Sequence, residues 1–356
     1  MTRIAFIGDS HLGYRHRFKA QRLHDFAHAF EDAVDKALRE RPDAIVFLGD
    51  LVHHSRPDPV SLRTAMRKLM EAAARCHVIV CIGNHEIEGH LGTTYSPIYG
   101  DVDENIHVLS TESPHCLLEM GGRSVCFHGF EYIRSRERAE EALKKIEAKG
   151  QENILCIHQA IEKYSYPYEL SLSALRAAAP KFSLIMCGHI HLHREIKEVS
   201  DITPAWYCGS TERVSFNEAG NKTGFMLFDS DYRNPRFIDV ESATMSHVRL
   251  SFKGTPQQAN ALIEETIRKD PAKLLKIDLN GEIEGDPLDI RRDWEAIAPE
   301  RTILEVSVSS PSTHPEAHLE RMELNEGLIC EYFQKTGTNN PELLEKCLEL
   351  FKRYAQ

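Results

Sequence analysis

Four short apolar runs in this sequence each end in a glycine that is followed by a side chain able to bind a metal ion. These segments are Phe6-Ile7-Gly8-Asp9, Phe47-Leu48-Gly49-Asp50, Cys81-Ile82-Gly83-Asn84 and Met186-Cys187-Gly188-His189. A fifth run, residues 154–157, leads directly into His158. Glycine at a strand end permits a sharp turn and a close approach of the backbone to an ion. The pattern therefore predicts that several strands deliver metal ligands to one edge of a sheet.

The spacing of two histidines adds further ligands to this set. His11 follows Asp9 by two residues, and His191 follows His189 in the same way. Because residues two apart in an extended segment face the same side, each pair can converge on one ion. The candidate metal ligands are Asp9, His11, Asp50, Asn84, His158, His189 and His191.

This set combines oxygen and imidazole ligands and contains no thiolate. Such ligands suit Mn²⁺, Fe²⁺ or Zn²⁺ better than Mg²⁺ or Ca²⁺. Seven ligands are too many for one tetrahedral ion but fit two, with Asp50 as the expected bridge. Two divalent ions about 3.5–4 Å apart can clamp a phosphate and activate water for in-line attack. The sequence thus predicts a two-metal enzyme that hydrolyses phosphate esters.

Two more histidines stand in the same loops, His53 after Asp50 and His85 after Asn84. Neither is needed to complete the set of ligands. A histidine beside a phosphate can stabilise developing charge or protonate the leaving oxygen, which makes both of them candidate catalytic residues. The alternative is that they only support the metal ligands.

The elements that must position these residues form an α/β pattern in the first two-thirds of the chain. Strands are predicted at residues 4–7, 44–48, 78–82, 125–127, 154–157, 184–186, 206–208 and 225–228. Most of these runs are apolar without alternation, as expected for strands that are covered on both faces. Apolar residues at helical spacing from Leu23 to Ala37 predict an amphipathic helix between the first two strands.

The chain divides into three predicted segments. Residues 1–245 form the catalytic domain, 246–312 a small α/β domain, and 313–356 a helical tail. Within the small domain, strands are predicted at 248–252, 274–279 and 303–308, and a helix at 257–268. The tail predicts two amphipathic helices, which either bind a partner or pack on their own protein.

Composition narrows the class of protein. Among 356 residues, 42% are hydrophobic, and no apolar run approaches the roughly 20 residues of a membrane helix. The nine cysteines are scattered and include no C-x-x-C pair, as expected in a reducing compartment. We therefore expect a soluble cytoplasmic protein. The formal charge of −11 argues against binding nucleic acid by bulk electrostatics, although bound cations would reverse the sign locally.

In order and spacing, these motifs resemble the signature of the calcineurin-like metallophosphoesterases. They are Asp9-Ser10-His11, Gly49-Asp50, Gly83-Asn84-His85-Glu86, His158 and Gly188-His189-Ile190-His191. Within that superfamily, residues 9–13, 49–53 and 157–159 are similar to the double-strand-break repair nucleases known as SbcD or the meiotic recombination eleven nuclease. Residues 209–213 and 222–225 resemble the stretch that closes their nuclease domain. The resemblance covers about residues 1–240.

The resemblance implies a fold and an activity. The fold is a two-sheet β-sandwich flanked by helices, with a small capping domain. The seven ligands would hold two Mn²⁺ ions, His85 would act on the transition state and leaving group, and His53 would be its partner. The implied activity is 3′-to-5′ exonuclease and single-strand endonuclease cleavage of DNA in double-strand-break repair. An SbcC-like coiled-coil ATPase or another DNA motor is the implied partner, and we also expect a homodimer.

One residue departs from the pattern of the repair nucleases. Glu86 stands where they commonly carry aspartate and where protein phosphatases carry glutamate. A phosphatase or phosphodiesterase acting on small molecules or nucleotides is therefore an alternative, as is a scaffold protein that has lost its metal. The complete set of ligands argues against the scaffold.

Some residues give weaker signals for substrate binding. His16, Arg17 and Arg213 are candidates for contacting the substrate, although an ordinary loop charge explains the first two equally well. Three alternating tyrosines after His158, namely Tyr164, Tyr166 and Tyr168, could stack on bases or simply pack their loop. His24 and His28 have zinc-site spacing but no further ligands beside them, which favours a solvated helix face.

Overall fold

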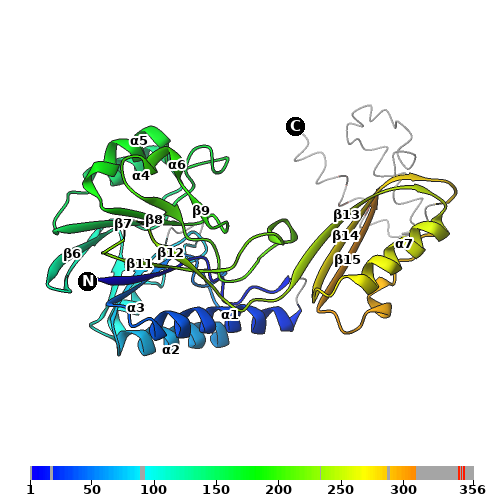
Figure 1. The fold of residues 1–356 in the computed structure, drawn as a ribbon, viewed down its shortest axis with the longest axis horizontal. Coiled ribbons are helices and arrows are strands. Elements are labelled where there is room, and N and C mark those ends of the chain that lie inside the picture. Colours follow the sequence, from blue (N-terminus) through cyan, green and yellow to red (C-terminus); the bar gives the residue numbers. More distant parts are fainter. Residues whose placement is uncertain are drawn as a thin grey trace.

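The computed structural model describes residues 2–16, 19–88, 93–232, 234–286 and 289–309, with 344, 346 and 348. The predicted tail at 313–356 therefore lies outside the described residues, apart from those last three positions. Two six-stranded sheets form the larger part of the molecule, and a three-stranded sheet stands at one end (Figure 1). No helix within the described ranges is long and apolar enough to cross a membrane.

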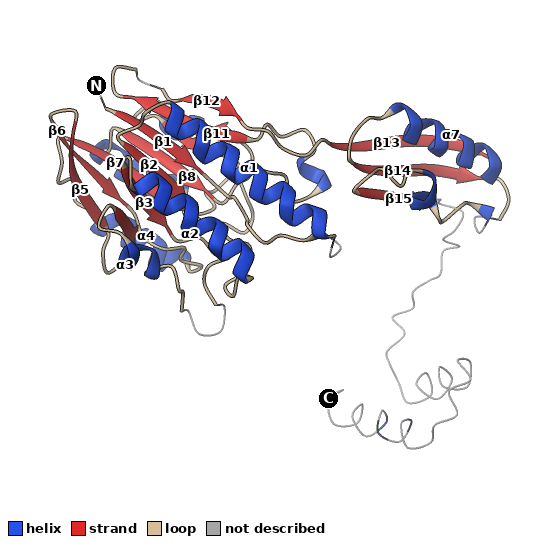
Figure 2. Ribbon diagram, turned by 90° about the horizontal axis from the view of Figure 1, so that it is seen from below, coloured by secondary structure: helices blue, strands red, loops and turns tan. Residues whose placement is uncertain are grey.

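The first sheet carries the amino-terminal strand at its centre. In spatial order its strands are β12 (Arg236–Asp239), β11 (Gly224–Asp229), β1 (Arg3–Ile7), β2 (Ala44–Leu48), β3 (His77–Cys81) and β4 (Ile106–Leu109). The strands from β1 to β4 are parallel, while β11 runs antiparallel to both β1 and β12. Two helices, α1 (Ala20–Arg39) and α2 (Pro59–Ala73), cover its outer face (Figure 2). A short helix, α3 (Ile98–Val102), precedes β4.

The second sheet has helices on its own outer face. Its strands, in order, are β5 (His115–Met120), β6 (Arg123–His128), β7 (Glu152–His158), β8 (Leu184–Gly188), β10 (Ala205–Tyr207) and β9 (Arg194–Glu195). The covering helices are α4 (Arg136–Lys145), α5 (Leu172–Ala178) and α6 (Lys197–Ser200), with a 3₁₀ turn at Ala179–Lys181.

Apolar side chains fill the space between the two sheets. Phe6 and Leu48 from the first sheet pack in one cluster with Ile154 and Met186 from the second. Separate apolar clusters lie under the helices on each outer face. The architecture is thus a two-sheet sandwich flanked by helices, which confirms the predicted α/β metallophosphoesterase fold.

The three-stranded sheet has its own core. It consists of β13 (Met245–Gly254), β14 (Leu274–Ile283) and β15 (Ile303–Ser309), all parallel, with helix α7 (Pro256–Lys269) between the first two. Thr255 and Gln258 form a capping box at the start of α7. Ile263, Ile277 and Trp294, the last in a 3₁₀ turn at Trp294–Ile297, are buried in one cluster. The sheet also packs on Phe216, which lies in a 3₁₀ turn at Phe216–Glu218 of the larger part.

A fully buried arginine joins α1 to the segment that leads toward the three-stranded sheet. The Arg22 guanidinium donates to Asp25 at 2.9 Å and to the Arg213 carbonyl at 2.6 Å. It also lies 3.7 Å from the carboxylate of Glu212, which is equally buried. Glu212 in turn accepts hydrogen bonds from the backbone nitrogens of Arg213 and Ala243. The ion pair therefore organises this connection.

We predict that Arg22→Met lowers the free energy of unfolding by about 3–5 kcal/mol, because it leaves the buried Glu212 carboxylate without its cation. Urea unfolding followed by circular dichroism measures the change. Arg268→Met is the control, since it removes an exposed i,i+4 pair with Glu264 that is worth about 0.3–0.5 kcal/mol. Equal effects of the two substitutions would contradict the prediction.

Candidate metal centre

The loops that follow β1, β2 and β8 hold their ligands in strained backbone conformations. Four candidate ligands have φ between 44° and 80°, namely Asp9, His11, Asp50 and His189. Side chains other than glycine rarely occupy this left-handed region, and such residues cluster at functional sites. Parallel strands explain why the loops meet, because their carboxyl ends lie at one edge of the sandwich.

Asp9, His11 and His191 form the first ligand group. Their ligating atoms all lie within 4.8 Å of one another. The Nε2 atoms of His11 and His191 are 2.9 Å apart. Asp9 Oδ1 accepts a hydrogen bond from the backbone nitrogen of His189 at 2.9 Å, whereas the buried Oδ2 has no hydrogen-bond partner among the described residues. A buried carboxylate oxygen without a donor fits a cation at this position.

Asp50, His158 and His189 form the second group, which also lies within 4.8 Å. The side-chain oxygen of Asn84 adds a fourth ligand, since it is 2.9 Å from His189 Nδ1 and 3.1 Å from His158 Nε2. The structure thus brings all the predicted ligands together in two groups.

Asp50 lies between the two groups. Its Oδ2 is 3.3 Å from His158 Nε2 in the second group and 3.7 Å from His11 Nε2 in the first. Its Oδ1 accepts a hydrogen bond from the backbone nitrogen of His85 at 2.9 Å. This position allows one carboxylate to be shared by two ions.

Hydrogen bonds to their second nitrogens orient two of the imidazoles. His158 Nδ1 donates to the Leu48 carbonyl at 2.8 Å, which leaves Nε2 for an ion. His191 Nδ1 lies 3.1 Å from Glu218 Oε1, so that its Nε2 faces Asp9 and His11. Such partners fix the tautomer and direction of a ligating histidine. Glu218 was not predicted from the sequence, because it stands in a turn that is separate from the ligand motifs.

Glu86 lies behind the ligands and does not join them. Its buried carboxylate accepts hydrogen bonds from the backbone nitrogens of Asp50, Val52 and Gly83, at 3.0, 3.1 and 2.8 Å. The residue that departs from the repair-nuclease pattern therefore holds two ligand loops together from within the protein.

Burial and neighbouring charges shift the pKa values of the ligands. Burial raises the pKa of Asp9 to about 6 and lowers that of His189 to about 3. Burial disfavours the charged forms of Asp50 and His158, but the opposite charge of each residue stabilises the charged form of the other. As a result, the pKa of Asp50 is lowered and that of His158 is raised to about 10. His189 is therefore neutral and able to bind a cation, whereas His158 must release the proton on Nε2, which faces Asp50, when a cation binds.

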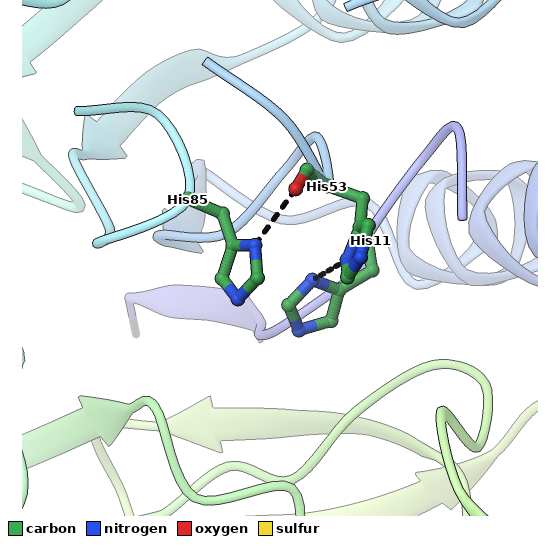
Figure 3. Close-up of side chains that lie close together, drawn as sticks. All are labelled: His11, His53 and His85. Carbon is green, nitrogen blue, oxygen red and sulfur yellow. Dashed lines mark hydrogen bonds between the residues drawn. The ribbon is translucent and has the colours of Figure 1, made fainter. Parts of the chain in front are cut away.

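The two candidate catalytic histidines lie against each other at this centre (Figure 3). Their rings stack with centroids 4.6 Å apart, and His85 Nδ1 donates to the His53 carbonyl at 2.7 Å. His85 Nε2 is 3.9 Å from Asp50 Oδ2, and a third of the side chain is exposed. His53 Nδ1 is 3.2 Å from Nδ1 of the ligand His11. His85 is therefore accessible to a substrate, while His53 contacts both His85 and a ligand.

The weaker candidates lie in several places. His16 Nε2 contacts Glu305 of β15 at 2.8 Å, and Arg17 is outside the described residues. The Arg213 guanidinium donates to Asn221, Ser242 and Ala243, so its donors are used within the protein. Among the tyrosines, Tyr164 donates to Glu198, Tyr168 lies under Arg136, and Tyr166 is exposed. His24 and His28 are exposed, as predicted.

The family model for calcineurin-like phosphoesterases matches residues 2–193, which include every candidate ligand. The chain belongs to that family. Curated relatives of this phosphoesterase are DNA double-strand break repair proteins Mre11. The protein from Methanocaldococcus jannaschii is 30% identical, with 74% of this chain and 73% of the relative covered. The one from Archaeoglobus fulgidus is 26% identical, with 83% and 71% covered. The chain is therefore a metal-dependent phosphodiesterase, whose cofactors are divalent metal ions.

We predict that Glu218→Ala weakens one of the two metal-binding steps of this phosphoesterase by about 10–100-fold, because His191 loses the partner that orients it. Calorimetric titration with Mn²⁺ measures both steps. Glu152→Ala is the matched control, since Glu152 pairs with Arg123 at the start of β7, away from the ligand loops. Unchanged affinity in Glu218→Ala would refute the role of Glu218.

We predict that Gly83→Ala abolishes binding of both ions. A Cβ at this position would overlap Oδ1 and the backbone nitrogen of Asp50, so the shared carboxylate must move. The same titration tests this, together with circular dichroism to verify folding. Gly100→Ala is the control because its Cβ would make only ordinary contacts. Wild-type affinity in a folded Gly83→Ala protein would show that Asp50 is not shared.

Proposed function

We propose that this phosphoesterase is a two-metal DNA nuclease, with Mn²⁺ as the preferred ion and Fe²⁺ or Zn²⁺ as alternatives. The observation that carries the proposal is the pair of ligand groups that meet at Asp50. The relatives that are named as DNA double-strand break repair proteins support DNA as the substrate. The activities proposed are 3′-to-5′ exonuclease and single-strand endonuclease cleavage during break repair.

Each ligand has a place in this proposal. Asp9, His11 and His191 would hold the first ion, Asn84, His158 and His189 the second, and Asp50 would contribute to both. When bound, such ions neutralise the phosphate and lower the pKa of water.

His85 supplies a proton to the leaving group in this proposal. Its Nδ1–H donates to the His53 carbonyl, which fixes the ring with Nε2 on the side of Asp50. In the protonated ring, Nε2–H can donate to the oxygen that leaves the phosphate. His53 stacks on this ring and contacts His11, so it keeps both imidazoles in place.

The three-stranded sheet is proposed as the domain that holds DNA over the centre. His16, five residues beyond the ligand His11, contacts Glu305 of β15, so this sheet lies next to a ligand loop. In this proposal 1–245 is the nuclease domain and 246–312 the capping domain. We further propose that the protein is a cytoplasmic homodimer. Its partner in this proposal is an SbcC-like ATPase or another DNA motor, which binds to residues 313–356.

We predict that the protein shortens end-labelled DNA in the presence of Mn²⁺ and that His85→Ala reduces the rate by about 10²–10⁴-fold. The backbone N–H that His85 donates to Asp50 survives the substitution, so the variant should retain its metal. A gel assay on single- and double-stranded DNA, with metal analysis of both proteins, measures this.

His115→Ala is the control, because His115 is exposed on the edge strand β5. Intact DNA together with cleavage of bis(4-nitrophenyl) phosphate would instead indicate a phosphodiesterase acting on small molecules. A variant as active as the wild type would remove His85 from the mechanism.

A further inference from the structure

A groove of about 1080 Å³ opens beside the second ligand group. Asn84 and His189 of the second ligand group line it, together with Tyr132, Arg134, Arg138 and Tyr168. Sites for drug-sized ligands occupy about 300–1,000 Å³, so this groove is at the upper limit for one small molecule. A ligand in it would extend from the metal centre past the start of α4.

Tyr132 forms a fixed aromatic wall of this groove, next to the candidate ligand His189. Its ring stacks on His189 with centroids 5.7 Å apart and planes 29° apart. Its hydroxyl donates to Glu169 at 3.1 Å, and its backbone nitrogen donates to the Ile82 carbonyl at 2.8 Å. A ring held at three points loses little entropy when a base or sugar packs on it, and stacking of a base on an aromatic side chain contributes about 1–3 kcal/mol.

Two arginines along the groove have guanidinium groups that are not engaged in hydrogen bonds or ion pairs with the described residues. Arg134 and Arg138 are exposed, and neither guanidinium makes a hydrogen bond or ion pair with any described residue. Arg136 lies between them in sequence. Its guanidinium instead makes a cation–π contact with Tyr168, 5.7 Å from the centre of the ring. In a chain with 54 acidic and 43 basic residues, two unpaired arginines beside a phosphoesterase centre mark a place for further phosphates.

We propose that this groove holds a single nucleic-acid strand next to the scissile phosphate, with adjacent phosphates on Arg134 and Arg138 and one nucleotide against Tyr132. A single strand is favoured over a duplex because stacking on the tyrosine requires an unpaired base face. The inference rests on the proposed nuclease function and deepens it, since it assigns the strand and the residues that hold it.

The test compares Arg134→Gln/Arg138→Gln with wild type, using the full chain with Mn²⁺. The substrates are a labelled single-stranded oligothymidylate, the same strand in a duplex, and bis(4-nitrophenyl) phosphate. Salt is varied because each phosphate contact contributes about 0.7 to the slope of log affinity against log salt for single strands.

For the single strand we expect kcat/KM to fall about tenfold or more, since two charged hydrogen-bonding partners are lost. The salt dependence should become shallower by about 1.4, while hydrolysis of the small diester stays within about twofold. The control Arg123→Gln/Arg236→Gln removes two exposed arginines paired with Glu152 and Glu40, at the opposite edge of the sheets, and should match wild type.

Several outcomes would overturn the inference. An unchanged slope would show that the arginines hold no phosphate, and a loss confined to the duplex would assign the groove to double-stranded DNA. A parallel loss of diester hydrolysis would place the arginines in the catalytic centre. If wild type cleaves the diester but neither DNA, the proposed function itself fails, and this result is distinct from the others.

An abasic scan tests the aromatic wall without altering the protein. Removing the base of one nucleotide near the cleavage site should lower kcat/KM by about 5–150-fold, which corresponds to the stacking energy. The same abasic substrate should show no such penalty with Tyr132→Leu. Equal rates for all abasic positions with wild type would exclude stacking on Tyr132.

Discussion

The three hydrogen bonds that the Glu86 carboxylate accepts from backbone nitrogens hold the metal centre together. Two of these nitrogens belong to the loop after β2 and one to the loop after β3, so a single buried side chain fixes the distance between Asp50 and Asn84. Buried backbone donors without a partner would each cost about 1–3 kcal/mol, which makes any other arrangement of these loops unfavourable. Both ligand groups depend on this constraint because Asp50 lies between them, 3.3 and 3.7 Å from a histidine of each.

Much of the fold and of the ligand set could be predicted from the sequence, for a physical reason. The strands that carry ligands are buried on both faces, so their apolar runs stand out, and the residue after each run lies at the common edge. The strands that were not predicted are β4, β5, β9 and β12, and each is at the edge of a sheet. An edge strand has one neighbour and tolerates mixed sequence: along β5, residues alternate between exposed and half-buried.

Contacts between distant segments could not be predicted in the same way. Glu218 orients His191 across 27 positions of sequence, and a lone glutamate in a turn carries no pattern that shows this. Arg213 was a candidate for substrate binding, yet its guanidinium donates to carbonyl and hydroxyl oxygens of the segment that leads to the three-stranded sheet. That role depends on the tertiary fold, which brings Asn221, Ser242 and Ala243 next to Arg213, and local sequence does not reveal this contact.

The left-handed backbone at Asp9, His11, Asp50 and His189 has a consequence for how this chain can change over time. Each such residue costs the folded state about 1–3 kcal/mol relative to an unstrained one, and glycine or asparagine would relieve much of that cost. Backbone strain alone therefore favours replacement at the positions that the proposed chemistry needs most. In a descendant released from catalysis, replacement of His11 by glycine or asparagine would relieve backbone strain, whereas loss of Asp50 alone would leave the buried His158 without its charge partner.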